Sequence, residues 1–373
     1  MKVLLVITHG NIGGATNVVI DLAKGLKSKG IDVAVGFGEG EYLRKKLDEI
    51  AVPRFDLKSI KRGHNPLAAI LFIFEMKKLA KKEGFDVMQF NSSNSLPGCL
   101  GAKLADKKIK TVFTVHGLSA LDKNYRTFFL LKFAYYLFFK FFLSFADAVV
   151  FVSKNNFEEA KKMKLVRDGY VIYNGLPAAD LVFLARTEAR RAIEEKMSAR
   201  LENKFLIGSI GRLSYQKNYE FLIKVFPELL KIKNDAVCVI IGDGPKRTEY
   251  KCLINRLGLK DNVFLAGEMR DGPRYAKAFD LFVLPSRYEG LPVTLVECLF
   301  ANVPTLVSDV GGNREIANGQ SLYKLDDEDD FVRKFSDASR KPENYLCDDS
   351  KKESFTLERM SEDYLKLFNN LTR

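Results

Sequence analysis

Residues 281–316 read LFVLPSRYEGLPVTLVECLFANVPTLVSDVGGNREI, and they form the most informative stretch of the chain. An apolar run, Leu281–Pro285, leads into a glycine turn and then into a helical pattern that starts near Pro292. A strand, a tight turn and a helix start together present free backbone N–H groups and the positive end of a helix dipole, which favour an anionic ligand. Glu289 lies on the turn and Glu297 lies within the helix. The two carboxylates are therefore predicted to meet different parts of an extended ligand.

The alternation of strand and helix extends along the whole chain. In the first half the predicted strands are Lys2–Thr8, Asp32–Phe37, Asp86–Phe90, Lys110–Val115, Ala148–Ser153 and Tyr170–Tyr173. In the second half they are Phe205–Gly211, Ala236–Gly242, Val263–Ala266, Leu281–Pro285 and Thr305–Ser308. Helical stretches separate them, which predicts an α/β chain with a parallel, doubly wound sheet in each half.

A change of composition separates the two halves. Residues 174–204 pass from NGLPAAD into the charged helical run ARTEARRAIEEKMSARLENK. We therefore place the first domain at residues 1–175 and the second at residues 204–350. The last segment is an amphipathic helix, and its predicted apolar face consists of Phe355, Met360, Tyr364 and Leu367.

The pair Glu289 and Glu297, the motif GGNREI at 311–316 and the loop IGRLSYQKN at 210–218 resemble the signature of the family-4 retaining glycosyltransferases. The resemblance covers nearly the whole chain. It implies the GT-B architecture, in which two facing Rossmann-like domains hold the site in the cleft between them. It also implies that the C-terminal helix, about residues 355–373, packs back on the first domain.

The same resemblance implies a role for each motif in binding a nucleoside-diphosphate sugar. Arg212 and Lys217 bracket a strand-to-helix turn, where two cations can hold a diphosphate and neutralise it as it leaves. Glu289 would orient the donor sugar, Glu297 would accept hydrogen bonds from the ribose, and His116 would contact the sugar. The other expected donor-binding positions are Gly13, Gly14, Gly211, Asp243, Gly290, Leu291 and Pro292.

No metal ion and no cofactor is expected, because the cation pair can take the electrostatic role of a metal. The acidic run at 326–330 is interpreted as a helix cap. Asn302 stands where the family commonly has glycine, and asparagine tolerates the left-handed conformation that this turn requires. Since Arg212 and Lys217 would face an open cleft, replacing either is expected to change folding little.

The first half of the chain carries all of its net positive charge. Residues 1–173 contain 28 Lys and Arg against 16 Asp and Glu, whereas residues 174–373 contain 31 of each. Such an imbalance indicates an anionic partner for the first domain. No nucleic-acid-binding motif is visible, so an anionic membrane surface is the favoured partner.

The segment at 125–145, YRTFFLLKFAYYLFFKFFLSF, is rich in phenylalanine. Its polar positions Lys132, Tyr136, Lys140 and Ser144 recur every four residues and so share one helical stripe. Two lysines inside the run argue against a transmembrane span. Two alternatives remain open, an interfacial helix with snorkelling lysines and a core helix with a narrow polar face.

These observations predict a metal-independent glycosyltransferase of the hexosyltransferase type. The donor is expected to be UDP-linked, and the acceptor to be a lipid-linked or growing glycan of the cell envelope, since the EGLP variant at 289–292 is similar to family members that build capsule and O-antigen polysaccharides. The start, MKVLLVITHGNIGG, reads as a first strand, which favours a cytoplasmic protein, peripheral on the inner face of the membrane. The alternatives are an epimerase of the same fold and a non-catalytic nucleotide-sugar-binding protein.

Overall fold

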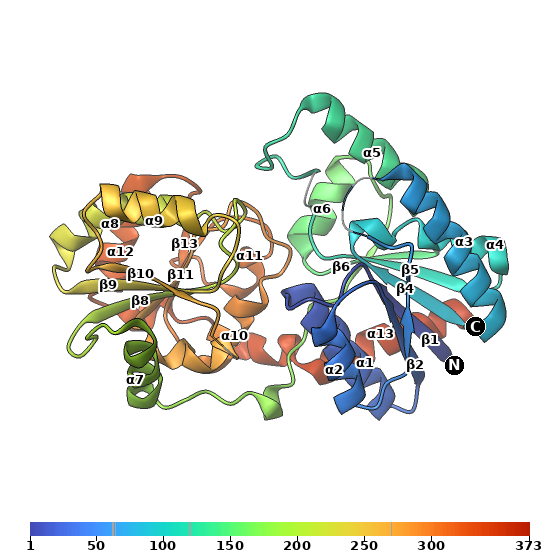
Figure 1. Cartoon of the computed structure of the whole chain (residues 1–373), viewed down its shortest axis with the longest axis horizontal. Helices are drawn as coiled ribbons and strands as arrows, with labels where there is room; N and C mark the ends of the chain where they lie inside the picture. The colour runs from blue at the N-terminus through green and yellow to red at the C-terminus, as the bar shows by residue number, and fades with distance from the viewer. Residues whose placement is uncertain (62, 64, 119–120, 270) are drawn as a thin grey trace. The chain divides into compact units, whose positions relative to one another are not determined.

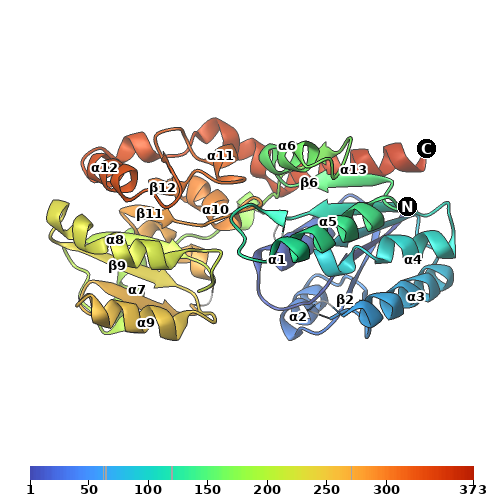
Figure 2. The same cartoon turned by 90° about the horizontal axis from the view of Figure 1, so that it is seen from above.

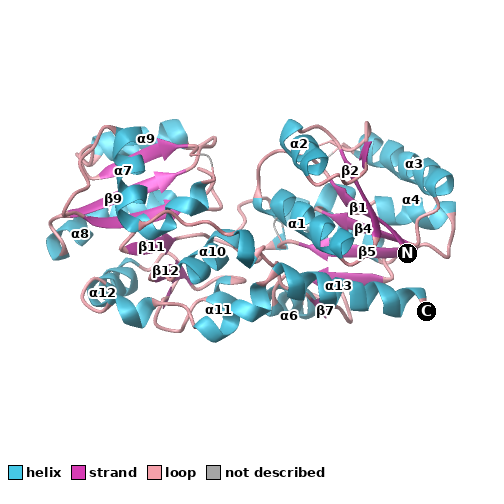
Figure 3. Cartoon of the chain, turned by 90° about the horizontal axis from the view of Figure 1, so that it is seen from below, coloured by secondary structure: helices cyan, strands magenta, loops and turns pink. Residues whose placement is uncertain are grey.

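The computed structural model describes residues 1–61, 63, 65–118, 121–269 and 271–373 of the chain. They form two compact units, which are described separately here. Unit 1 comprises Met1–Pro177 and Glu353–Arg373, and unit 2 comprises Ala178–Lys352. Each unit is a parallel sheet covered by helices (Figure 1, Figure 3).

Unit 1 contains a seven-stranded parallel sheet in the order β3-β2-β1-β4-β5-β6-β7. Its strands are β1 (Lys2–Ile7), β2 (Asp32–Phe37), β3 (Arg54–Asp56), β4 (Val87–Asn91), β5 (Lys110–Val115), β6 (Ala148–Phe151) and β7 (Tyr170–Val171). Its helices are α1 (Gly14–Ser28), α2 (Glu41–Glu49), α3 (Pro66–Glu83), α4 (Gly98–Ala105), α5 (Phe129–Leu143), α6 (Lys154–Lys162) and α13 (Leu357–Thr372). The central strands are buried along their length, as expected for a parallel sheet covered on both faces (Figure 1).

Unit 2 contains a six-stranded parallel sheet in the order β10-β9-β8-β11-β12-β13. Its strands are β8 (Phe205–Ile210), β9 (Ala236–Ile241), β10 (Val263–Gly267), β11 (Leu281–Leu284), β12 (Thr305–Ser308) and β13 (Leu322–Tyr323). Its helices are α7 (Arg186–Met197), α8 (Tyr219–Ile232), α9 (Arg247–Arg256), α10 (Val293–Ala301), α11 (Asn313–Ile316) and α12 (Glu328–Ala338). The two sheets confirm the predicted fold class.

The strand orders define a switch point in each sheet, where the direction of winding reverses. In unit 1 it lies between β1 and β4, and in unit 2 between β8 and β11. Loops after two such neighbouring strands diverge to opposite faces of the sheet, which leaves a crevice at their carboxyl ends for ligands. The loops after β8 and β11 carry Lys217 and Glu289, so these two predicted site residues lie at the switch point of unit 2.

The charged segment before β8 belongs to unit 2. Helix α7 is attached there through Arg190, whose Nη2 donates to Asp280 Oδ2 at 2.6 Å and whose Nε donates to the Ala278 carbonyl at 3.0 Å. The same carboxylate accepts from the backbone N–H of Leu206 at 2.7 Å. This ion pair therefore ties α7 to the beginning of β8.

The C-terminal helix α13 belongs to unit 1 although it is far from β1–β7 in sequence. The predicted apolar positions Phe355, Met360, Tyr364 and Leu367 are all buried. Tyr364 also reaches β5, where its hydroxyl lies 3.1 Å from Thr114 Oγ1. A side chain added at Gly25 of α1 would collide with Ser361, so the two helices pack closely.

Helix α5 lies in the layer formed by α3, α4 and α5 on one side of the unit 1 sheet (Figure 1, Figure 2). Of its fifteen residues only Phe139 and Leu143 are buried. The core alternative for the phenylalanine-rich segment therefore applies to these two side chains and not to the helix as a whole. Within the described residues, no helix is long and apolar enough to cross a membrane.

Two local predictions are confirmed in unit 2. Asn302 ends α10 in the left-handed conformation, at φ 53° and ψ 49°. Asp327 caps α12, since its side chain accepts from the backbone N–H of Asp330 at 3.0 Å.

Candidate active site

The centre of the candidate site in unit 2 is an ion pair across the switch point. Lys217, which follows β8, donates from Nζ to Glu289 Oε1, which follows β11, at 2.7 Å. The lysine side chain is 15% exposed and the glutamate side chain is 6% exposed. Lys217 is thus largely buried and does not face an open cleft, contrary to expectation. In place of a small effect on folding we now predict that its removal destabilises the fold, because a buried carboxylate would lose this cation.

Two further side chains hold the Glu289 carboxylate in place. Ser286 Oγ donates to Oε1 at 2.6 Å, and Gln216 Nε2 donates to Oε2 at 3.3 Å. Gln216 also donates to the Tyr288 carbonyl at 3.1 Å. Sequence analysis did not select Ser286 or Gln216. Their positions in the sequence could have indicated a role in the site, since Ser286 directly follows the apolar run Leu281–Pro285 and Gln216 directly precedes Lys217.

Arg287 also connects the loop after β11 to the loop after β8. Its backbone N–H donates to the Gln216 carbonyl at 2.8 Å, and its Nη1 donates to the Tyr215 carbonyl at 2.8 Å. Its guanidinium carbon also lies 4.3 Å from the centre of the Tyr215 ring, a cation–π distance. The loops after β8 and β11 are thus fixed to each other before any ligand arrives.

The GGNREI motif supports the Glu289 turn from β12. Gly311 has a positive φ of 44°, and a Cβ there would lie 2.0 Å from the Glu289 carbonyl oxygen. A Cβ on Gly312 would lie 2.0 Å from the Gly290 carbonyl oxygen. Only glycine permits this approach of backbone to backbone. Asn313 completes the contact, because its Nδ2 donates to the Ser308 carbonyl at 2.8 Å.

The turn leads into α10, whose N-terminus is the predicted anion cradle. Pro292 occupies the N-cap position and offers no side-chain hydrogen bond to the first turn. Leu291 is buried beside it, and Glu297 lies further along α10 and is 8% exposed. A helix start without a side-chain cap, a few residues after the carboxylate that Lys217 contacts, can accept an anionic group.

Arg212 and its neighbours form the rim of this region. Arg212 is exposed in the loop between β8 and α8. That loop is attached to the loop after β9, because Gly211 donates to the Ile241 carbonyl at 2.9 Å and Leu213 donates to the Asp243 carbonyl at 2.9 Å. Asp243 in turn accepts from the backbone N–H of Gly244 at 2.7 Å. The guanidinium is therefore available to solvent on a loop of defined position.

The remaining predicted residues, His116, Gly13 and Gly14, belong to unit 1. Gly13 precedes α1 and Gly14 begins it, directly after β1. His116 follows β5, and its Nε2 lies 3.0 Å from Asn91 Oδ1 at the end of β4. All three positions thus follow strands at the carboxyl edge of the unit 1 sheet.

Asn91 and Gln89 are polar residues that sequence analysis missed, although a glutamine inside the buried strand VMQFN was a signal. Gln89 Nε2 donates to Thr114 Oγ1 at 2.8 Å. Asn91 Nδ2 and Gln89 Oε1 are buried and have no hydrogen-bond partner among the described residues. Such groups are rare in folded proteins and call for an explanation, for which a ligand is one candidate.

Burial lowers the pKa of His116 from 6.5 to about 4. Because the folded-state pKa is depressed, the unfolded chain takes up a proton first as the pH falls. We therefore expect His116 to reduce stability progressively as the pH falls from about 6.5 toward 4, and to have no such effect at pH 7. An NMR titration of the three histidines of this chain tests this expectation. A His116 signal that titrates near pH 6.5 would contradict it.

Comparison with known proteins agrees with this geometry. Two family models match the chain in succession, Glycosyltransferase Family 4 over residues 12–180 and Glycosyl transferases group 1 over residues 191–352. The UDP-Gal:alpha-D-GlcNAc-diphosphoundecaprenol alpha-1,3-galactosyltransferase of Escherichia coli is 27% identical over 331 residues, which are 86% of this chain and 83% of that protein. The O-antigen biosynthesis glycosyltransferase WbnH of Escherichia coli is 25% identical over 343 residues, which are 91% of this chain and 90% of that protein.

Solved structures show the same fold. HepE of Anabaena in complex with UDP has a TM-score of 0.78 at 18% identity, covering 99% of this chain and 100% of that one. Sucrose-phosphate synthase of Thermosynechococcus elongatus has a TM-score of 0.81 at 16% identity, covering 100% of this chain and 99% of that one.

The fold is that of a GT-B glycosyltransferase. The chain belongs to glycosyltransferase family 4 and is a glycosyltransferase enzyme.

Proposed function

We propose that this glycosyltransferase, which takes its sugar from a nucleotide-sugar donor, uses a UDP-linked hexose and transfers it with retention to a lipid-linked or growing glycan of the cell envelope. The observation that carries the proposal is the Lys217–Glu289 ion pair at the switch point of unit 2, beside the uncapped start of α10. A lysine and the backbone N–H groups at the start of a helix suit a diphosphate. A fixed carboxylate suits the hydroxyl groups of a sugar.

The choice of UDP and of a lipid-linked acceptor is supported by the similarity of this chain to two known proteins. The Escherichia coli galactosyltransferase is named for UDP-Gal and for an acceptor on diphosphoundecaprenol, and HepE of Anabaena was solved with UDP and with UDP-glucose. The net charge of unit 1 adds an independent argument. This unit carries 31 Lys and Arg against 20 Asp and Glu, which suits an acceptor attached to a lipid diphosphate.

In the proposed reaction, the bond between the anomeric carbon and the donor diphosphate breaks, and the acceptor oxygen bonds to that carbon on the same face. The leaving diphosphate gains negative charge as its bond lengthens. Arg212, Lys217 and the N–H groups at the start of α10 stabilise that charge more in the transition state than in the ground state. The leaving phosphate oxygen accepts the proton of the acceptor hydroxyl. Glu289 holds the donor sugar in position.

A transfer assay tests this proposal. Purified full-length protein is incubated with UDP-linked and GDP-linked sugars and with a lipid diphosphate-linked acceptor, and the products are separated by mass. We expect UDP release matched by a glycosylated acceptor whose new bond has the anomeric configuration of the donor. An epimerised nucleotide sugar without glycosylated product would instead support the epimerase, and inversion of the anomeric centre would contradict the retaining assignment.

We also propose that the reaction needs no metal ion or other cofactor. Arg212 and Lys217 provide positive charge where a divalent ion would bridge the phosphates. The acidic groups nearby have other roles, since Asp243 pairs with Arg247 at 3.4 Å and Asp327 caps α12.

Treatment with EDTA is therefore expected to leave the initial rate of transfer unchanged within experimental error. The measurement compares EDTA-treated enzyme with enzyme supplied with Mg²⁺ or Mn²⁺. Loss of activity on chelation that either ion restores would overturn the metal-free assignment.

Finally, we propose that the enzyme works in the cytoplasm as a peripheral protein on the inner face of the membrane, where a lipid-linked acceptor would be presented. The basic charge of unit 1 supports this placement. Lys and Arg residues are attracted to anionic lipid headgroups, and salt weakens that attraction.

A further inference from the structure

Helix α5 presents an apolar stripe to solvent. Phe129, Phe133, Leu137 and Phe141 recur every four residues, so they lie along one side of the helix. They are 79%, 51%, 49% and 55% exposed, respectively. Figure 1 shows α5 at the outer side of its layer, with its first turn away from the sheet. An exposed stripe of four large apolar side chains is uncommon on a soluble surface and marks an interaction site.

Three side chains of the polar stripe of α5 contact loops of the same unit. Lys132 Nζ donates to the Asp122 carbonyl at 2.8 Å. Lys140 donates to the carbonyl of Lys164, and Tyr136 also donates to that oxygen, at 3.4 Å. Lys132 and Lys140 thus bind loop carbonyls of their own unit, although Lys140 and Ser144 remain exposed. The side of the helix that faces the protein carries the buried Phe139 and Leu143, and the apolar stripe lies on the solvent side.

Helix α3 adds a second exposed apolar group in the same layer. Leu67, Ile70, Leu71 and Phe74 are each at least half exposed. Buried residues of α3, α4 and α5 share one core cluster, so the three helices cover the same face of the sheet. Among the described residues, 17 large hydrophobic side chains are exposed, and 12 of them lie on these helices or on Phe128, just before α5. The remaining five are scattered, which makes this layer the apolar surface of the protein.

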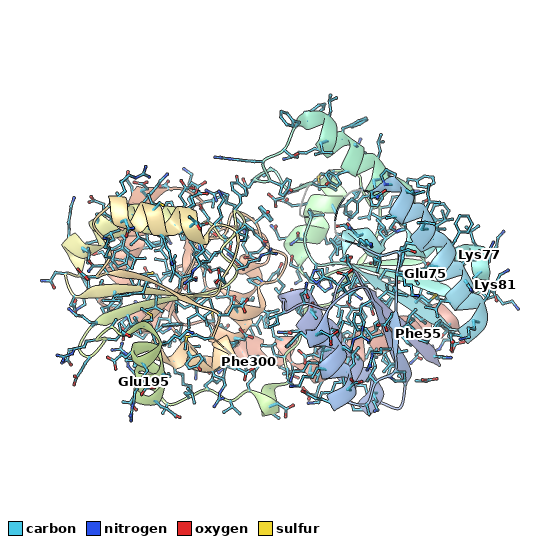
Figure 4. All side chains as sticks on the ribbon, in the orientation of Figure 1. Phe55, Glu75, Lys77, Lys81, Glu195 and Phe300 are labelled. Atoms are coloured by element: carbon cyan, nitrogen blue, oxygen red, sulfur yellow. The ribbon has the colours of Figure 1, made fainter. Side chains whose placement is uncertain are left out.

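The charge of the same unit identifies the partner. Unit 1 has a net charge of +11, whereas unit 2 has 28 Lys and Arg against 27 Asp and Glu. Lys77 and Lys81 project from α3 at the outer edge (Figure 4). Glu75 is the acidic residue between Phe74 and Lys77. Its carboxylate accepts hydrogen bonds from the backbone N–H groups of Lys58 and Ser59, at 2.8 and 3.0 Å. Apolar side chains beside lysines on a unit of net positive charge fit an anionic bilayer, whereas a second copy of unit 1 would be repelled.

We propose that the α3–α5 layer docks on an anionic bilayer and inserts the α5 stripe, Phe129, Phe133, Leu137 and Phe141, among the acyl chains. The inference deepens the proposed function, since it names the surface by which the enzyme reaches a lipid-linked acceptor. It adds a separate physical claim, that apolar insertion as well as charge holds the enzyme at the membrane. Charge alone would be lost at high salt, whereas inserted side chains would retain part of the binding.

The chain contains no tryptophan, so one introduced indole reports its own surroundings. We expect Phe133→Trp to shift its emission to shorter wavelength on vesicles of phosphatidylcholine and phosphatidylglycerol, and to be quenched by brominated acyl chains. Leu257→Trp, on an exposed position of unit 2, is the matched control and should show neither change. An indole at position 133 that stays in water while the protein sediments with the vesicles would overturn insertion. Burial of that indole in a dimer without vesicles would overturn the choice of partner.

A second pair of variants tests the energetic contribution of the stripe. Phe133→Ser combined with Leu137→Ser should weaken vesicle binding at least tenfold, most clearly at high salt. Val182→Ser combined with Leu257→Ser, two exposed positions of unit 2, should not weaken it. Transfer to a short-chain, water-soluble acceptor should be unchanged in both pairs, so loss of docking is distinguishable from failure of the proposed function. Unchanged vesicle binding by the first pair would contradict the proposal.

Discussion

Arg212→Ala is expected to lower the rate of transfer by about 100- to 1000-fold, which is about 3–4 kcal/mol of transition-state stabilisation. Arg212 is exposed on the loop between β8 and α8 and has no ion-pair partner among the described residues. Its removal should therefore leave the folded state intact. The effect on kcat should exceed the effect on UDP affinity, because the diphosphate gains charge only as the glycosidic bond breaks.

The matched control for this variant is Lys224→Ala. Lys224 is an exposed cation on α8 that pairs with Glu220 at 2.6 Å, and it lies outside the candidate site. Activity should be unchanged in this control. The thermal midpoints of both variants should lie close to that of the parent. Parental turnover in folded Arg212→Ala protein would remove the proposed role of this side chain.

Lys217→Met is expected to affect both stability and activity. Lys217 and Glu289 form a largely buried pair with an Nζ–Oε1 distance of 2.7 Å. Removing one partner leaves an uncompensated buried charge, which typically costs about 3–5 kcal/mol in the free energy of unfolding. Transfer should fall by orders of magnitude as well, because the diphosphate loses a cation.

A double-mutant cycle separates the two roles of this pair. Lys217→Met combined with Glu289→Gln removes both charges. The amide oxygen at position 289 can still accept a hydrogen bond from Ser286 or Gln216. Denaturant unfolding should show that this double variant recovers much of the stability lost by Lys217→Met alone, while transfer remains at the low level. Recovery of transfer together with stability would show that the ion pair has only a structural role.

The fold could be predicted because most central strands are nearly continuous apolar runs. In a parallel sheet both faces are buried, so runs such as KVLLVI and AVCVII identify their strands without reference to distant residues. The edge strands β3 and β13 were missed. They contain only three and two residues, RFD and LY, and no extended apolar run surrounds them, whereas the equally short β7 lies within the apolar run YVIY.

The site was only partly predictable, for a different reason. Motif spacing selected Lys217 and Glu289, but it could not reveal that they pair across 72 positions of sequence, since that depends on the strand order. The orientation of α5 also could not be predicted. Nearly every residue of this helix is apolar, so periodicity does not identify the buried face, and both the interfacial and the core alternative remained open. The burial of Phe139 and Leu143 settles which side faces the protein.

Hydrogen–deuterium exchange of the full chain with and without UDP tests the central claim most directly. The proposed diphosphate site lies at the switch point of unit 2. UDP should therefore slow exchange in three segments, residues 211–218, 287–293 and 311–313, and this protection should weaken in Arg212→Ala. Binding of UDP that leaves exchange in these three segments unchanged would contradict the account.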